Sequence, residues 1–336
     1  MLNNKSILIT GGTGSFGKSF VKRILNKFPK IKRLVILSRD ELKQFEMSEE
    51  FPENKYKSIR YFIGDVRDLS RLIRAFEKID IIIHAAALKQ VPTAEYNPME
   101  YIKTNVIGAQ NIIEASIEKK VKKVIALSSD KAAAPINLYG ATKLCSDKLF
   151  VAANNYSGHS GSFSVVRYGN VMGSRGSIIP NFIKEAPSGK LSITDKSMTR
   201  FNITLEQSVD MVLFSIQNSF GSEILVPKIP SYRITDLAKS IGPSCKLNII
   251  GVRAGEKIHE EMITESDSAT TFDIGDYYII LPNNSKKILN YYSKKFTTTK
   301  VKKQFRYNSG LNPAFLKIDE IRKLIKKHVD RNFKPI

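Results

Sequence analysis

Short apolar runs alternate with helical patterns through the first half of the chain, and this alternation limits the fold more than any other feature. The runs are rich in Val and Ile and lie at residues 6–10, 33–38, 60–64, 80–86, 123–129 and 163–169. Between them, apolar side chains recur at helical spacing over residues 19–28, 69–78 and 108–120. Strands that are apolar on both faces fit a parallel sheet covered by helices on each side. The pattern therefore predicts an α/β fold with a doubly wound parallel sheet.

A glycine-rich turn joins the first predicted strand to the first predicted helix. It reads Gly11-Gly12-Thr13-Gly14-Ser15-Phe16-Gly17, with glycines at the spacing GxxGxxG. Such glycines permit a tight turn, close approach of the backbone to a pyrophosphate, and close packing of helix on strand. The amides at the start of the helix also favour an anion. The turn therefore predicts a dinucleotide site in a Rossmann-like sheet.

The end of the second predicted strand bears on the choice between NAD and NADP. An acidic residue there suits the ribose 2′-hydroxyl of NAD, whereas Arg suits the 2′-phosphate of NADP. The sequence reads Ser38-Arg39-Asp40. Ser38 and Arg39 favour NADP, and Asp40 leaves NAD open. Residues after the third and fourth strands are placed to flank the adenine and its ribose, namely Asp65, Val66, Ala85 and Ala86.

The alternation weakens after about residue 170, where Gly, Pro and Ser become more frequent. We therefore expect an NADP-binding Rossmann domain over residues 1–170 and a smaller C-terminal substrate-binding region over residues 171–290. Residues 291–336 form a basic tail, in which apolar residues recur at helical spacing over 318–329. Asp319 and Glu320 near the start of that stretch suit a helix N-terminus. We predict that it forms a packing helix.

The charge of the chain is strongly positive. Lys and Arg number 53 and Asp and Glu number 32, so the formal net charge is 53 − 32 = +21. Such an excess suggests an anionic partner, namely nucleic acid, an acidic membrane surface or a phosphorylated small molecule. Lys scattered among Asn and Ile is equally what a lysine-favouring genome produces. Residues 281–336 hold 15 Lys or Arg and 3 Asp or Glu, a net +12. No RNA-recognition motif or helix-turn-helix pattern accompanies this charge, so we expect a phosphorylated small molecule and no nucleic acid.

The cysteines and the apolar runs restrict the setting of the protein. Cys145 and Cys245 lie far apart and outside any Cys/His spacing, so we expect no disulfide framework and no metal site. The chain has no run of about 18 apolar residues and no apolar leader at its start. We therefore expect a cytoplasmic protein with no integral membrane association.

A tyrosine and a lysine indicate the chemistry. Tyr139 and Lys143 lie at i and i+4 on a predicted helix, so they share one face. Near an oxidised nicotinamide, a lysine beside a tyrosine stabilises the phenolate and lowers the pKa of the tyrosine. The phenolate can then accept a proton from a substrate alcohol. A hydroxyl, from Ser128 or Ser129, ends the preceding strand and stands beside this pair.

At this point the chain resembles the extended short-chain dehydrogenase/reductases. More narrowly, it is similar to the inverting UDP-N-acetylglucosamine 4,6-dehydratases that open pseudaminic acid synthesis. Asp130-Lys131 is the decisive match, because retaining dehydratases usually have Asp-Glu there and 4-epimerases lack such an acid/base pair. The resemblance rests on TGGTGSFGK (10–18), SRDELKQFEM (38–47), FIGDVRD (62–68), IHAAALKQVP (83–92), AEYNPMEYIKTN (94–105), SSDKAAAPINLYGATKLCSDKLF (128–150), RYGNVMGSRGS (167–177), VPKIPS (226–231) and RAGEK (253–257).

The resemblance implies a three-stage dehydration. Tyr139, assisted by Lys143 and Ser129, takes the proton of the sugar 4-hydroxyl while C4 is oxidised. Lys131 then removes the C5 proton while Asp130 protonates the departing 6-hydroxyl. Reduction at C6 and reprotonation on the opposite face invert C5 and regenerate the tightly bound NADP. For this role Lys131 must be neutral near pH 7, which requires a lowered pKa.

The resemblance also implies binding residues and an assembly. UDP-N-acetylglucosamine is the implied substrate, and a homo-oligomer, dimer or hexamer, is the implied assembly. Further cofactor contacts fall on Lys43, Lys89 and Asn105. The implied substrate contacts are Lys89, Tyr139, Asn170, Arg175, Gly176, Ser177, Ile178, Ile179, Pro180, Arg200, Arg253 and Glu256.

Several positions depart from the family pattern, and three alternatives stay open. Gln90 stands where relatives frequently have His, and Ala134 stands where Asn is usual. Asn202 stands where an aromatic residue is usual, and Ser129 stands where Thr is more common. We expect Ala134 and Asn202 to alter the pocket around the sugar. A capsular-type UDP-sugar 4,6-dehydratase and a UDP-sugar 4-epimerase share the fold. A dinucleotide-sensing regulatory or nucleic-acid-binding protein would share it without the chemistry.

Overall fold

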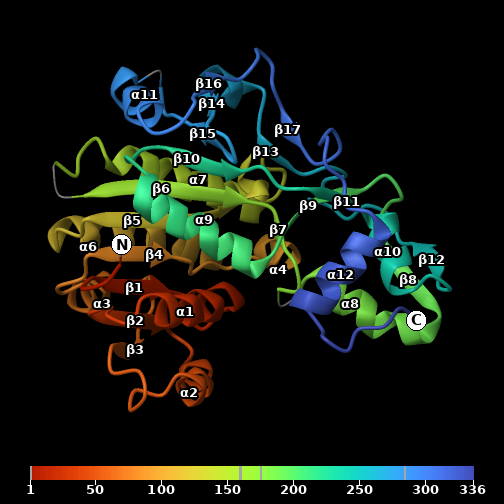
Figure 1. The fold of residues 1–336 in the computed structure, drawn as a ribbon, viewed down its shortest axis with the longest axis horizontal. Coiled ribbons are helices and arrows are strands. Elements are labelled where there is room, and N and C mark those ends of the chain that lie inside the picture. The colour runs from red at the N-terminus through yellow and green to blue at the C-terminus, as the bar shows by residue number, and fades with distance from the viewer. Residues whose placement is uncertain (1, 159–160, 175, 284) are drawn as a thin grey trace.

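The computed structural model describes residues 2–158, 161–174, 176–283 and 285–336. A larger lobe is built around one sheet, and a smaller lobe lies to one side of it (Figure 1). Among the described residues, ten strands form the main sheet, of which seven neighbours run parallel and three at one edge run antiparallel. In spatial order they are β16 (Thr299–Lys300), β14 (Thr271–Asp273), β15 (Tyr277–Ile280), β10 (Ile224–Pro227), β6 (Ser162–Tyr168), β5 (Lys123–Ser129), β4 (Ile81–His84), β1 (Ser6–Thr10), β2 (Arg33–Ser38) and β3 (Ile59–Ile63).

The predicted strands are all present. The observed bounds of β1, β2 and β5 are the predicted ones, and those of β3, β4 and β6 differ by one or two residues at the ends. Every residue of β1 is buried. The strand lies between β2 and β4 with helices above and below, so both of its faces need apolar side chains.

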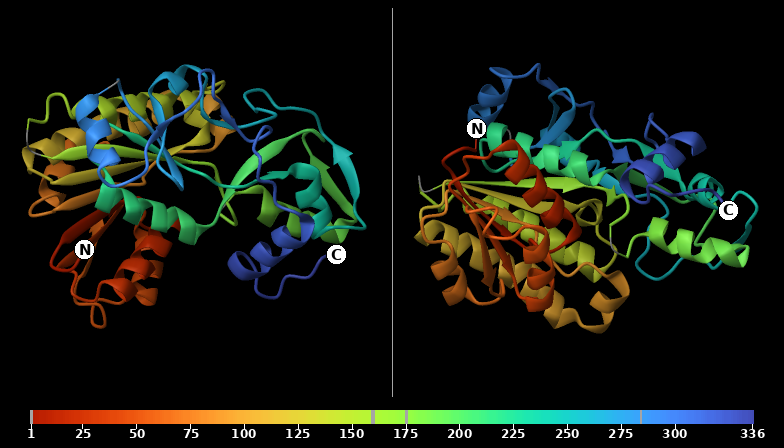
Figure 2. Two further views of the ribbon diagram at one scale, coloured as in Figure 1. Left: turned by 45° about the horizontal axis from the view of Figure 1, so that its top comes forward. Right: turned by 60° about the horizontal axis from the view of Figure 1, so that its bottom comes forward.

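Helices cover both faces of the main sheet, which confirms the doubly wound prediction. On one face α1 packs beside α9, and on the other α3, α6 and α7 pack in a row (Figure 2). A π-helix, η1, leads into α6. The helices of this lobe are α1 (Ser15–Lys27), α2 (Glu41–Glu50), α3 (Leu69–Ala75), α4 (Val91–Tyr96), α5 (Pro98–Tyr101), η1 (Ile102–Ile107), α6 (Gly108–Glu118), α7 (Leu138–Ala153), α9 (Leu205–Asn218) and α11 (Lys286–Ser293).

Strands from beyond residue 170 complete the main sheet, so the predicted boundaries at 170 and 290 do not follow the packing. β10 pairs in parallel with β6, with Ile224 opposite Val165. β15 then pairs antiparallel with β10. The main hydrophobic core accordingly contains residues from Leu2 to Tyr307. The sequence pattern did not predict that β10 and β15 join the main sheet, because these late strands are short and do not alternate with long helices.

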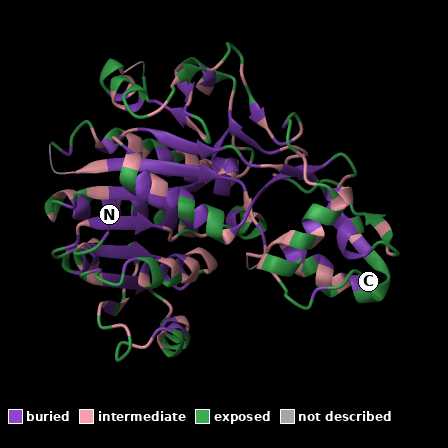
Figure 3. Cartoon of the chain, in the orientation of Figure 1, coloured by how far each residue is buried: buried purple, intermediate pink, exposed green. Residues whose placement is uncertain are grey.

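The smaller lobe has a hydrophobic core of its own, drawn from three separate stretches of the chain (Figure 3). Its strands β8 and β12 pair in parallel, and α12 packs on α10. α12 lies where the sequence predicted a packing helix, and Ile321 and Ile325 of its apolar face are fully buried. The elements of this lobe are α8 (Ile178–Glu185), η3 (Ala186–Ser188), β8 (Lys190–Ile193), α10 (Ile234–Ile241), β12 (Lys246–Ile249) and α12 (Ile318–His328).

Short strands join the two lobes next to the end of β5. β7 (Asn170–Val171), β9 (Thr199–Ile203) and β11 (Ser231–Arg233) form a small sheet. β13 (Glu261–Ile263) pairs with β17 (Tyr307–Asn308) and packs against the single turn η2 (Asp130–Ala132), and the turn η4 (Ser266–Thr270) follows it. Within the described ranges, no helix is both long enough and apolar enough to cross a membrane.

Candidate active site

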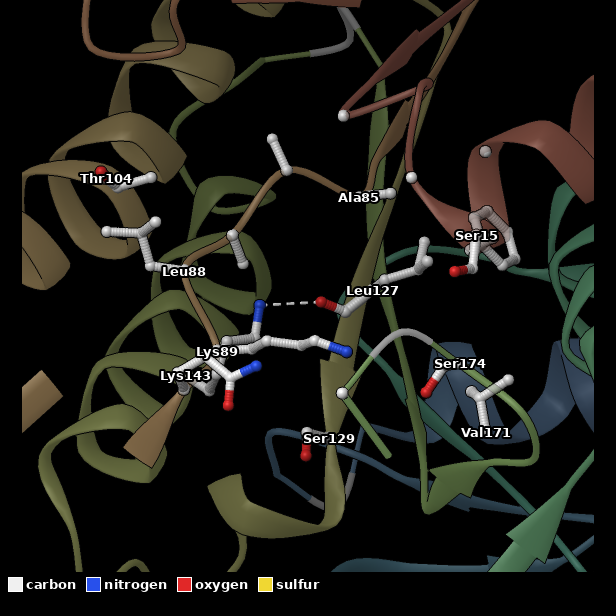
Figure 4. Close-up of a pocket in the computed structure, with 18 of the residues that line it drawn as sticks. Ser15, Ala85, Leu88, Lys89, Thr104, Leu127, Ser129, Lys143, Val171 and Ser174 are labelled. Atoms are coloured by element: carbon white, nitrogen blue, oxygen red, sulfur yellow. Dashed lines mark hydrogen bonds between the residues drawn. The ribbon is translucent and has the colours of Figure 1, made fainter. Parts of the chain in front are cut away.

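A cavity of about 790 Å³ lies along the carboxyl ends of the parallel strands. In an open α/β sheet, ligands bind at this edge. Figure 4 shows Ser15 of α1, Ser129 at the end of β5 and Lys143 of α7 among the residues that line it. The cavity is lined by these residues that the sequence predicted: Gly11, Thr13, Gly14, Ser15, Phe16, Gly17, Ser38, Arg39, Asp40, Lys43, Asp65, Val66, Ala85, Ala86, Lys89, Ser129, Asp130, Lys131, Tyr139, Lys143, Asn170, Gly176 and Ser177.

The glycine-rich turn is shaped as a dinucleotide site requires. Gly11 has a φ of +64°, and a Cβ on it would lie 2.8 Å from the Cα of Ala86. A Cβ on Gly17 would lie 2.1 Å from the carbonyl oxygen of Gly12. These close approaches bring β1, β4 and α1 together around the turn. The first amides of α1 stay available, since no acidic side chain stands in its first turn, so the turn fits a pyrophosphate.

The neighbouring end of β2 is basic. Asp40 caps α2, because its carboxylate accepts a hydrogen bond from the Lys43 amide at 3.0 Å and pairs with the Lys43 ammonium. The hydroxyl of Ser38 lies 3.0 Å from that of Thr13. Arg39 is half exposed and stands 3.6 Å from Asp65. The acidic group at this strand end is therefore already engaged, while Arg39 faces the cavity mouth.

Tyr139 and Lys143 enter the cavity from the first turns of α7. Asn137 caps this helix by accepting the Gly140 amide at 2.7 Å. The Lys143 ammonium donates to the Leu127 carbonyl at 2.8 Å (Figure 4). Burial raises the pKa of Tyr139 to about 12, although the positive charge of Lys131 and a hydrogen bond with Ser129 oppose this rise. In the protein alone, desolvation of the phenolate outweighs the nearby charge. The predicted lowering of the Tyr139 pKa concerns the site with an oxidised nicotinamide beside the phenol, and it stays a prediction.

Asp130, which is buried, and Lys131, which is partly buried, form an ion pair directly after β5. Their charged groups lie 3.1 Å apart, and Ser129 donates to the same Asp130 oxygen at 2.9 Å. Burial raises the pKa of Asp130. Burial also acts to lower the pKa of Lys131, but the charges of Asp130 and Glu260 outweigh it, and the pKa is raised. The surroundings of Lys131 thus do not supply the lowered pKa that the role of base requires, because two carboxylates contact its ammonium.

Comparison with known proteins assigns this constellation to a family. A family model described as "Polysaccharide biosynthesis protein" matches residues 7–282. The chain is 53% identical over 334 residues to the "UDP-N-acetylglucosamine 4,6-dehydratase (inverting)" of Campylobacter jejuni strain 81-176, covering 97% of this chain and 98% of that protein. The chain belongs to this family of extended short-chain dehydrogenase/reductases. The resemblance seen in the sequence is confirmed.

Two further relatives show how broad the family is. The chain is 43% identical to a "UDP-glucose 4-epimerase" of Rickettsia akari, covering 97% of this chain and 96% of that protein. The crystal structure of Pen from Bacillus thuringiensis is 37% identical, with a TM-score of 0.88 and coverage of 97% of this chain and 98% of that one. Relatives named as epimerases and relatives named as dehydratases thus belong to one family. The fold therefore cannot distinguish the two activities, and the side chains of the site must.

Not every residue that the family pattern suggested lines the cavity. Asn105 is buried behind it and holds Leu88 through both the amide and the carbonyl, at 2.9 Å each. Arg200 is buried on β9, beside Glu256 and Glu260. Arg175 lies outside the described residues. The others that do not line the described cavity wall are Ile178, Ile179, Pro180, Arg253 and Glu256.

Two of the family departures, Ala134 and Asn202, lie outside the described cavity wall. Ala134 has a φ of +44°, is exposed and does not line the described cavity. Asn tolerates this left-handed region better than Ala does, which accounts for the usual Asn there. Asn202 is buried on β9, and its backbone amide donates to the Pro230 carbonyl. Asn202 also lies outside the described cavity wall. The expected effect of Ala134 and Asn202 on the sugar pocket therefore finds no support, whereas Gln90 does line the cavity.

Two polar residues of the site escaped the sequence reading. Thr104 of η1 lines the cavity, and its buried hydroxyl has no hydrogen-bond partner among the described residues. Glu260 lies 3.1 Å from Lys131. Thr104 lies inside the matched stretch 94–105, but its residue type gave no reason to single it out. Glu260 lies three residues beyond the matched stretch 253–257, so no motif contains it.

Proposed function

We propose that the chain is a C5-inverting UDP-N-acetylglucosamine 4,6-dehydratase that uses NADP. Its product is then UDP-2-acetamido-2,6-dideoxy-β-L-arabino-hex-4-ulose, as in the first step of pseudaminic acid synthesis. The observation that carries the proposal is the Asp130–Lys131 ion pair in the same cavity as Tyr139 and Lys143. An epimerase needs Tyr139 and Lys143, but it has no use for Asp130 and Lys131.

The residues around the glycine-rich turn fit a dinucleotide, and those at the end of β2 favour NADP. The turn of residues 11–17 would hold the pyrophosphate, and Arg39 and Lys43 would meet the 2′-phosphate. Asp40 is engaged in capping α2, so it is poorly placed to select the 2′-hydroxyl of NAD. The bound nicotinamide would supply the oxidation at C4 and the later reduction at C6.

Tyr139 is the proposed acceptor of the sugar 4-hydroxyl proton. Its high pKa in the protein alone means that the phenol is neutral until positive charge arrives next to it. Lys143 is held by the Leu127 carbonyl on the same side of the cavity. Ser129 contacts Tyr139 and Asp130 together, so it orients the proton acceptor of the first stage and the acid of the second.

Asp130 and Lys131 carry out the proposed elimination. Oxidation at C4 acidifies the C5 proton, and Lys131 removes it. Burial favours the protonated form of Asp130, which is the form that can donate to the departing 6-hydroxyl. Reprotonation of C5 on its opposite face then gives the inverted product. The substrate contacts proposed here are Lys89, Tyr139, Asn170, Gly176 and Ser177 in the cavity, with Arg200, Arg253 and Glu256 beyond it.

Product analysis in D₂O tests the proposal. Purified protein is incubated with UDP-N-acetylglucosamine and no external oxidant, and the product is examined by mass spectrometry and NMR. Loss of one water, with deuterium at an inverted C5, is the expected result. Isomerisation at C4 without loss of water would show an epimerase instead, and absence of turnover with added NADP would refute both enzymes for this substrate.

A further inference from the structure

Glu260 lies within the acid/base cluster although no motif contains it. It directly precedes β13, and its side chain is only 3% exposed. One carboxylate oxygen lies 3.1 Å from the Lys131 ammonium. The other oxygen is buried and has no hydrogen-bond partner among the described residues. A buried carboxylate with one free acceptor, touching the base of the reaction, calls for a chemical explanation.

Lys131 stands between two carboxylates at equal distance. Its ammonium is 3.1 Å from Asp130 and 3.1 Å from Glu260, and 3.5 Å from the Asn170 side-chain oxygen. If Asp130 were the only counterion, the pair would rest as a carboxylate and an ammonium. That state has the wrong protonation for elimination, because the acid has lost its proton and the base holds one.

The charges around the cluster favour a different distribution. Burial and the charge of Glu260 both raise the pKa of Asp130. Burial acts to raise the pKa of Glu260 too, but the positive charges of Lys131, Arg200 and Lys257 outweigh it and lower the pKa. The neutral form is therefore favoured at Asp130 and the ionised form at Glu260.

The remaining charged groups close the cluster. The Arg200 guanidinium stands 3.7 Å from Glu260 and 3.6 Å from Glu256. The Lys257 ammonium donates to the Ala133 carbonyl at 2.7 Å. Glu260 is thus held between cations, whereas the ion pair that Asp130 forms among the described residues is with Lys131.

We propose that Glu260 is a positioning residue for the acid/base pair, serving as the counterion of Lys131 and receiving its proton when the free amine is needed. This inference rests on the proposed dehydratase function. It explains how Asp130 can hold a proton beside a lysine, and how that lysine can lose one in a site that otherwise favours the ammonium.

The proton count balances over one elimination. At rest Asp130 is protonated, Lys131 is an ammonium and Glu260 is a carboxylate. One N–H bond of Lys131 breaks and an O–H bond forms on Glu260. The free amine of Lys131 takes the C5 proton, and Asp130 gives its proton to the departing hydroxyl, which leaves as water. The new proton on Lys131 then passes to Asp130, and that of Glu260 returns to Lys131, so the cluster regains its resting state.

Glu260→Gln in the full-length protein tests the inference, because it keeps the shape of the side chain and removes both its charge and its proton site. We expect kcat for dehydration to fall about 100-fold, with KM for UDP-N-acetylglucosamine within about twofold of wild type. The acid group of the kcat–pH profile should titrate at lower pH, because Asp130 becomes the counterion of Lys131. Oxidation at C4 should persist, so near-ultraviolet absorbance of reduced nicotinamide should build up during a single turnover.

Two further variants separate this role from a structural one. Glu261→Gln alters the adjacent buried glutamate, which pairs with Arg306 at 2.8 Å. It should lower the melting temperature and leave the kcat–pH profile unchanged. Glu260→Asp keeps the charge one methylene further back, and it should lower kcat while the acid group titrates near its wild-type pH.

The outcomes distinguish this inference from the proposed function. Wild-type protein that releases no water from UDP-N-acetylglucosamine would refute the function itself. Wild-type dehydration together with a Glu260→Gln variant of normal kcat and pH profile would overturn the inference alone. The inference also fails if Glu260→Gln and Glu261→Gln change activity and stability to the same extent, or if Glu260→Asp shifts the profile as far as Glu260→Gln.

Discussion

The glycine-rich end of the cavity and its acid/base end are built in different ways. The first is a continuous turn of the backbone, residues 11–17, in which the absence of side chains matters most. The second is a cluster of charged side chains that come from η2, α7, β9 and the residue before β13. The comparison teaches that one end depends on local backbone conformation and the other on how distant segments pack together.

The largest expected effect separates the two ends chemically. Lys131→Met removes the proposed base and leaves the glycine-rich turn untouched. We expect kcat for dehydration to fall about 1,000-fold, because the amine that takes the C5 proton is removed. Cofactor affinity, measured by fluorescence titration, should change less than about threefold. A comparable loss of cofactor affinity would show that the two ends are not independent.

A second test acts on the glycine-rich end. Gly17→Ala forces a Cβ to within 2.1 Å of the Gly12 carbonyl oxygen, so the turn must open. We expect a loss of about 3 kcal/mol in the free energy of unfolding and weaker cofactor binding. Gly189→Ala is the matched control, because its φ is +73° with no atom within 4 Å of the added Cβ. That variant should lose only about 1 kcal/mol, measured by denaturant unfolding; equal losses would contradict the steric argument.

The strands that support the glycine-rich end give a pH test. Burial lowers the pKa of His84, at the end of β4, from 6.5 to about 3, and Lys143 contributes to the same shift. Below pH 6.5 the unfolded chain binds a proton that the folded protein does not, so stability should fall as the pH falls from about 6.5 towards 3. At pH 5 the expected loss is about 2 kcal/mol. His84→Asn should remove this part of the pH dependence in urea unfolding curves; an unchanged slope would refute it.

The smallest expected effect lies at the edge of the acid/base end. Ala134 holds a φ of +44° at an exposed position, and Asn adopts this conformation more readily. Ala134→Asn should raise the free energy of unfolding by about 1 kcal/mol and leave kcat unchanged. Thermal unfolding and product NMR measure the two quantities. A change in kcat without a change in stability would show that residue 134 affects catalysis rather than stability.

The sequence alone predicted almost all of the glycine-rich end of the cavity. Its turn, the strand before it and the helix after it are consecutive, so a local pattern contains the whole arrangement. The sequence also predicted the two proposed catalytic pairs. Asp130 and Lys131 directly follow β5, and Tyr139 and Lys143 lie in the first turns of α7.

The rest depends on tertiary packing. Glu260 reaches Lys131 only because β13 packs against η2, and nothing near residue 260 in the sequence states this. The same packing raises the pKa of Lys131, whereas the role of base requires a lowered one, since a second carboxylate meets the ammonium. The division at residue 170 failed for a related reason: β10 and β15 are short strands whose partners lie far away in the chain.

The core of the smaller lobe has a consequence for how the protein is made. Its apolar side chains come from stretches around residues 172–198, 232–247 and 316–333. During synthesis, the turn that begins the chain can emerge and form long before the last helix exists. The apolar faces of α8 and α10 remain uncovered until the ribosome has released α12. A chain that lacks residues 317–336 would therefore keep its glycine-rich turn intact but leave an open, aggregation-prone lobe beside it.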